Sequence, residues 1–107
     1  MPGKRVILMV KVTAVWSTLN EFNEYWGKES LPTWIEHGAK HIGSFVNWLG
    51  APKSQIIRLF EFESLSAWEK FMQKREKMFV SEKGRELLPN LMGYIESLEE
   101  SVWISAY

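Results

Sequence analysis

Two histidines are the side chains of this sequence best suited to proton transfer near neutral pH. His37 and His41 stand four residues apart, on either side of Gly38-Ala39-Lys40. Because the ordinary pKa of histidine lies near neutrality, a general acid or base acting through histidine here must be one of these two. The alternative is structural, with His37 ending a helix and His41 beginning a strand. No metal site is predicted, since this spacing outside a helix lacks a fixed chelating geometry.

Charged residues inside apolar strand patterns form a second group of candidates. Lys11, Arg58, Glu61 and Glu63 interrupt runs of β-branched and aromatic residues. Burying an unpaired charge is costly, so these groups need partners or water. We expect Lys11 and Glu61 to pair across the sheet or to face a polar pocket under the helices. Glu61 is the candidate carboxylate for catalysis, and Lys11 and Arg58 are candidate ligand-binding groups.

Aromatic residues are abundant, with six Trp, six Phe and three Tyr in 107 residues. Such side chains can line an apolar ligand cavity between a sheet and its helices, which is a usual place for a site. They equally suit core packing or a dimer interface. The candidates for ligand binding are Trp26, Trp34, Trp48 and Trp68.

Composition and missing motifs exclude several function classes. Thirteen basic and thirteen acidic side chains cancel, so the positive field that attracts nucleic acids or anionic membranes is missing. Without cysteine, disulfides and thiolate chemistry are excluded. The sequence contains no phosphate-binding glycine loop, no Gly-x-Ser-x-Gly elbow and no His-Glu-x-x-His. No apolar run reaches the roughly 20 residues of a membrane span, so we expect a cytoplasmic protein.

The first half of the chain predicts a strand, a helix and a second strand. Residues 5–16 are rich in valine and predict a buried strand. The spacing of Thr18 and Glu21 predicts a capping box at the start of a helix. Pro32 should kink or restart that helix, and Gly38 should end it. Residues 41–49 alternate as a strand does, with Ser44 expected on the face opposite His41.

The second half predicts a strand, one or two helices and a last strand. A turn at residues 50–54 joins the previous strand to residues 55–63, so these two strands form a hairpin. Ser64 or Ser66 is expected to cap a helix over residues 66–79, whose inward stripe includes Arg75. Ser81 is expected to cap a third helix that breaks near Pro89. The last strand covers residues 97–107.

This order predicts an α+β fold of the ferredoxin-like, split β-α-β type, as one domain over residues 1–107. Its four-stranded antiparallel sheet carries helices on one face only. The other face should offer apolar residues from every strand, and a large exposed apolar area is uncommon on a monomer. We therefore expect a homodimer that pairs through its sheets.

Short segments of the chain also resemble one known family. They are Leu31-Pro32, His37-Gly38-Ala39-Lys40, Ile42-Gly43-Ser44-Phe45, Gly50 and the run from Ile57 to Leu65. Together they resemble the NIPSNAP family of the dimeric α+β barrel superfamily. The resemblance implies two split β-α-β subunits joined through their sheets into one barrel.

The resemblance leaves three hypotheses for function. The first is a protein that binds a small apolar molecule between its sheet and its helices. The second is a small monooxygenase, cofactor-free or haem-dependent, with His37, His41 or Glu61 as proton-transfer groups. Haem-degrading relatives carry a histidine on the second helix, which residues 66–79 lack, so no cofactor is predicted. The third is a non-catalytic protein that acts only through assembly.

Overall fold

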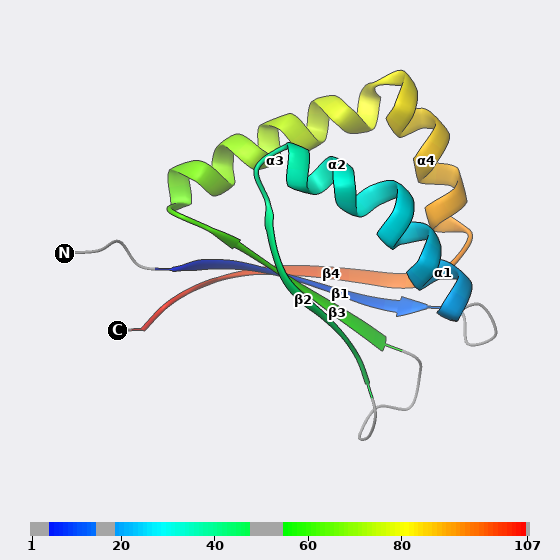
Figure 1. The fold of residues 1–107 in the computed structure, drawn as a ribbon, viewed down its shortest axis with the longest axis horizontal. Helices are drawn as coiled ribbons and strands as arrows, with labels where there is room; N and C mark the ends of the chain where they lie inside the picture. Colours follow the sequence, from blue (N-terminus) through cyan, green and yellow to red (C-terminus); the bar gives the residue numbers. More distant parts are fainter. Residues whose placement is uncertain (1–4, 15–18, 48–54, 107) are drawn as a thin grey trace.

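The computed structural model describes residues 5–14, 19–47 and 55–106. The predicted turn at residues 50–54, the cap at Thr18 and the candidate Trp48 therefore lie outside the described residues. Within those ranges one sheet lies beneath a layer of helices, and all the helices are on the same side of it (Figure 1). The predicted α+β architecture with one open sheet face is confirmed.

The sheet has four antiparallel strands in the order β2-β3-β1-β4. This is the order of a split β-α-β fold, in which the first and third strands are central. The strands are β1 (Val6–Ala14), β2 (Lys40–Val46), β3 (Gln55–Phe62) and β4 (Ile95–Ile104).

The first helical segment is continuous but changes its geometry twice. It consists of α1 (Leu19–Tyr25), a π-helical turn η2 (Trp26–Ser30) and α2 (Leu31–Glu36). Pro32 lies in the first turn of α2, directly after the π-helical turn. The predicted kink or restart corresponds to a change from π-helical to α-helical geometry at Leu31, one residue before Pro32, and the sequence pattern did not indicate the π-helical turn.

The second helical segment consists of α3 (Leu65–Val80) and α4 (Glu82–Met92). Each begins with a serine cap, since Ser64 Oγ accepts from the N–H of Ala67 and Ser81 Oγ accepts from that of Gly84. The predicted break at Pro89 is wrong, because α4 continues through it to Met92. Pro89 is exposed, so water can serve the carbonyl that loses its helical donor there.

The core lies between the helices and alternate residues of the two central strands. Its apolar strand residues are all at most 5% exposed: Val6, Leu8, Val10, Val12, Ala14, Ile56, Phe60 and Phe62. Arg58 shares this row with Ile56 and Phe60, as the alternation predicts. In the part of the chain that the structure describes, no helix is both long and apolar enough to cross a membrane.

An irregularity in β2 changes which of its residues share a face. The pairing with β3 shifts between His41 and Gly43, so His41 lies opposite Phe60 and Ser44 lies opposite Arg58. One extra residue in a strand reverses the faces of those that follow it. The predicted placement of Ser44 opposite His41 is therefore wrong, since both side chains are on the helix-covered face.

Gly38 ends α2 with a backbone φ of +104°, and its amide donates to the carbonyl of Ile35. A Cβ added there would meet no atom within 4 Å, so a substitution would cost only backbone strain. We expect Gly38→Ala to lower the free energy of unfolding by about 1–2 kcal/mol in urea titrations.

The matched control for Gly38 is Gly27, whose added Cβ also meets open space but whose φ is not positive. Gly27→Ala should leave stability unchanged or raise it, because alanine restricts the unfolded chain. Equal effects of the two substitutions would contradict the role assigned to Gly38.

Candidate functional site

A cavity of about 120 Å³ lies between the sheet and the helices. Side chains of both layers line it: Val10 and Val12 from β1, Trp26 from η2, Trp34 from α2 and Leu87 from α4. The surrounding groups are mostly apolar, and the polar ones are few. Such a hollow with few polar groups is typical of small-molecule sites.

Arg58 is the most deeply buried charged residue described, at 2% exposure. Its guanidinium carbon lies 3.7 Å from the ring centroid of Trp26, close enough for a cation–π interaction. Its Nη1 donates to Ser44 Oγ (3.0 Å) and its Nη2 donates to Asn23 Oδ1 (3.1 Å). Burial lowers the pKa of Arg58 to about 10, so the group remains cationic at neutral pH.

Arg75 and Glu100 form the second charged feature of the cavity. The guanidinium of Arg75 in α3 donates two hydrogen bonds to the carboxylate of Glu100 in β4, at 2.5 and 3.0 Å. The Arg75 side chain is 10% exposed and that of Glu100 is 28% exposed. This bidentate pair ties the helical layer to the edge strand.

His41 does not line the cavity but contacts residues beside it. Its Nε2 lies 2.9 Å from Ser44 Oγ, the oxygen that also accepts from Arg58. Its ring also contacts Trp26 and Phe60. Burial, and then the positive charge of Arg58, lower the pKa of His41 below its usual value.

The lowered pKa of His41 makes a testable prediction. Between the folded and unfolded pKa values the unfolded chain binds more protons, so stability should fall as pH decreases below about 6.5. NMR titration of the ring should give a midpoint below 6.5. The same signal should persist in His37→Gln and vanish in His41→Gln. A midpoint at or above 6.5 would contradict the inferred desolvation.

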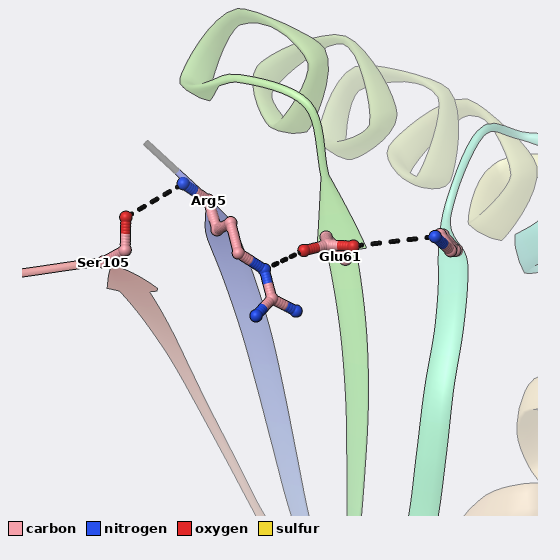
Figure 2. Close-up of polar contacts among 4 residues, drawn as sticks. Arg5, Glu61 and Ser105 are labelled. Atoms are coloured by element: carbon pink, nitrogen blue, oxygen red, sulfur yellow. Dashed lines mark hydrogen bonds and ion pairs between the residues drawn. The ribbon is translucent and has the colours of Figure 1, made fainter. Parts of the chain in front are cut away.

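Glu61 lies away from the cavity, on the open face of the sheet. Figure 2 shows its carboxylate beside the Arg5 guanidinium, and Lys40 Nζ is 3.8 Å away on its other side. The hydrogen bond from Arg5 holds the pKa of Glu61 below its usual value. The predicted pairing with Lys11 is wrong, because Lys11 lies opposite Ile57 and Glu61 lies opposite Ile7.

The remaining candidates separate into cavity and non-cavity positions. Trp26 and Trp34 line the cavity, whereas Trp68 packs against the core. His37 lies at the end of α2, where its Nδ1 is 2.8 Å from the carbonyl oxygen of Thr33. Lys11 is on the open face of the sheet. Thus the structure brings together Trp26, Trp34 and Arg58, with His41 adjacent.

Sequence reasoning missed four polar residues of the cavity: Ser30, Thr33, Arg75 and Glu100. Arg75 did carry a signal, because a charged residue on the inward stripe of a helix needs a buried partner. Glu100 interrupts the row of Leu98 and Val102 in the same way. Ser30 had no such signal, since its position depends on the π-helical turn.

The cavity does not fit a metal ion or haem. Its lining contains neither histidine nor cysteine, and the described residues contain no cluster of three or more histidine, cysteine, aspartate or glutamate side chains that could hold a metal ion. Haem iron is usually held by an axial histidine, cysteine, methionine or tyrosine. Met78 and Met92 do line the cavity, but its volume is only about 120 Å³, similar to that of cavities that hold benzene (about 150 Å³).

The strand order and the one-sided helical layer define a ferredoxin-like α+β protein with a cavity between its sheet and its helices. Residues 13–106 match the family model described as NIPSNAP. The chain therefore belongs to the NIPSNAP family, as the resemblance of its segments indicated. No curated protein matches the chain.

Solved structures with the same fold agree with this assignment. A NIPSNAP domain protein from Burkholderia xenovorans is 16% identical, with a TM-score of 0.79 and coverage of 94% of each chain. A NIPSNAP family protein from Agrobacterium tumefaciens is 21% identical, with a TM-score of 0.79 over 97% of this chain and 88% of that one. A candidate antibiotic biosynthesis monooxygenase from Bacillus cereus is 18% identical, with a TM-score of 0.63 over 98% and 96%. At these identities the similarity shows the fold alone.

Proposed function

We propose that this NIPSNAP family protein binds a small, largely apolar molecule in the cavity between its sheet and its helices. The observation that carries the proposal is the cavity itself, lined by Trp26, Trp34 and Leu87 around a few polar groups. A protein that acts only through assembly has no need of such a space, and close packing would normally fill it. The cavity therefore supports binding over assembly alone.

A cavity-filling variant tests this proposal. Leu91 lines the cavity from α4, so the bulk of Leu91→Trp should occupy it. Native mass spectrometry and a screen of small aromatic compounds should find a ligand for the natural protein and none for the variant. Val80, which is 69% exposed on α3, provides the control Val80→Trp. A natural protein without any ligand in either measurement would overturn the proposal.

The open face of the sheet supports a second copy of the chain as partner. Ile7, Met9 and Leu59 are only partly exposed on this face, but Phe45 is 56% exposed and Trp103 is 58% exposed. Aromatic residues gathered on one face are typical of interfaces. A second copy offers the same face, so two copies can pair about a twofold axis.

Solution mass measurements test the homodimer. Phe45→Glu combined with Trp103→Glu should turn a dimer into a monomer in light-scattering chromatography, because the charges would be buried in the interface. Ile35, 52% exposed on the helical side, gives the control Ile35→Glu, which should remain dimeric. A natural protein that is monomeric at all concentrations would refute the homodimer without affecting the cavity proposal.

Monooxygenase activity in the same cavity is the alternative, and the fold of the Bacillus cereus neighbour supports it. The three groups expected to transfer protons do not converge, however: His37 and Glu61 do not line the cavity, and His41 reaches it through Ser44 and Arg58. Oxygen uptake with the recovered ligand would favour the enzyme, and its absence would favour binding alone.

A further inference from the structure

Arg58 is a buried cation without a carboxylate partner among the described residues. In residues 5–14, 19–47 and 55–106, no Asp or Glu side chain lies within ion-pair distance of Arg58. The segments outside these ranges contain no aspartate or glutamate at all. Its two hydrogen-bond partners, Ser44 and Asn23, are neutral. A charge buried in this way is costly unless an anion compensates it.

The other ionisable groups of the cavity do not supply that anion. The Glu100 carboxylate is already engaged by Arg75 in two hydrogen bonds. The nearby His41 has a lowered pKa because of burial and Arg58, which favours its neutral form. The cavity therefore keeps one uncompensated positive charge.

Two residues that line the cavity each carry a buried polar atom without a hydrogen-bond partner. The two atoms are Arg58 Nε and Ser30 Oγ. Ser30 is 4% exposed, so bulk water does not serve its hydroxyl. A buried polar atom without a partner is uncommon in a folded protein and often indicates a functional site. Ser30 also ends a π-helical turn, a feature that recurs at functional sites.

We infer that the cavity binds a small carboxylic acid whose body is apolar and about the size of one ring. The carboxylate accepts from the free Nε–H of Arg58 and neutralises its charge, while Ser30 offers a second polar contact in the same cavity. The apolar body lies among Trp26, Trp34 and Leu87. This inference rests on the proposed binding function and specifies the chemical class of the ligand.

The volume sets the size of the acid. The cavity measures about 120 Å³, close to the roughly 150 Å³ of apolar cavities that hold benzene. Benzoate is therefore a suitable probe. Benzamide has the same shape without the charge, and toluene keeps only the apolar body.

Calorimetric titration of the full-length chain with these three compounds tests the inference. Benzoate should bind about ten- to a hundredfold more tightly than benzamide, because hydrogen bonds to a charged group are the stronger ones. If benzamide and toluene bind as tightly as benzoate, the cavity is a site for neutral molecules and the inferred acid is wrong. If none of the three binds, the proposed binding function itself fails.

Variants of the two unpartnered groups give an independent measurement. Arg58→Met should remove the preference for benzoate over benzamide while toluene still binds. Ser30→Ala is a smaller change that preserves the helix, and it should weaken benzoate by a few-fold. Arg85, exposed on α4, gives the control Arg85→Met, which should keep the full preference. An unchanged preference for benzoate over benzamide in both Arg58→Met and Ser30→Ala would overturn the inference. If Arg58→Met does not fold, an unchanged preference in Ser30→Ala is enough to overturn it.

Discussion

Glu100→Ala is expected to lower the free energy of unfolding by about 3 kcal/mol, because it leaves Arg75 buried without its counter-ion. The Arg75 side chain is only 10% exposed, so water cannot replace the two hydrogen bonds that the carboxylate accepts. Arg75 also lies over the rings of Trp34 and Phe79, at 5.5 and 5.6 Å. Urea unfolding followed by tryptophan fluorescence would measure the loss.

Removing Arg75 and removing Glu100 should lower the free energy of unfolding by different amounts. Arg75→Met keeps the apolar stem and leaves Glu100, which is 28% exposed and can take up water, so this change should cost less than Glu100→Ala. The double variant Arg75→Met/Glu100→Leu should recover much of the stability, since an apolar pair often replaces a buried ion pair without loss. A smaller effect of Glu100→Ala than of Arg75→Met would contradict the assigned burial.

Gly84→Ala is expected to cost about 2–3 kcal/mol and to distort the cavity, because its Cβ has no room. The added atom would overlap the carbonyl oxygen of Met78 and lie 2.7 Å from the Cα of Phe79. Both contacts are with backbone, which cannot move aside as a flexible side chain can. Since these three residues all line the cavity, the variant should weaken the proposed ligand binding as well as folding.

Gly93 provides the matched control for Gly84. Gly84 lies near the start of α4, and Gly93 directly follows its last residue. An added Cβ there would meet its nearest atoms at 3.5 and 3.8 Å, which is ordinary contact. Gly93→Ala should therefore change the unfolding midpoint little. If Gly84→Ala were as mild as Gly93→Ala, the close approach of α3 and α4 would be wrong.

The fold could be predicted because its signals are local. Alternation in residues 55–63 puts Arg58 on the same face as Ile56 and Phe60, and the serine before each later helix did cap it. These patterns depend on neighbours in the sequence, so one chain is enough to interpret them. The pairing of β1 with β3 then determines which of their side chains lie on the same face of the sheet.

The candidate site was predicted only in part because it depends on contacts between distant segments. The pairing of Arg75 with Glu100 joins residues 25 positions apart, and no local pattern indicates which carboxylate an inward arginine will meet. The position of Ser30 depends on a π-helical turn that has no strong sequence signal. Trp34 could be named from aromatic abundance, but only packing showed that it lines the cavity and Trp68 does not.

The irregular residue of β2 has a consequence for comparing this chain with its relatives. His41 and Ser44 share a face because one extra residue stands between paired positions. A relative that lacks this residue would turn one of the two side chains away from Arg58, even with an identical histidine and serine. Gaps in an alignment at this point therefore show whether both side chains lie on the face of Arg58, and strand length should be compared together with residue identity.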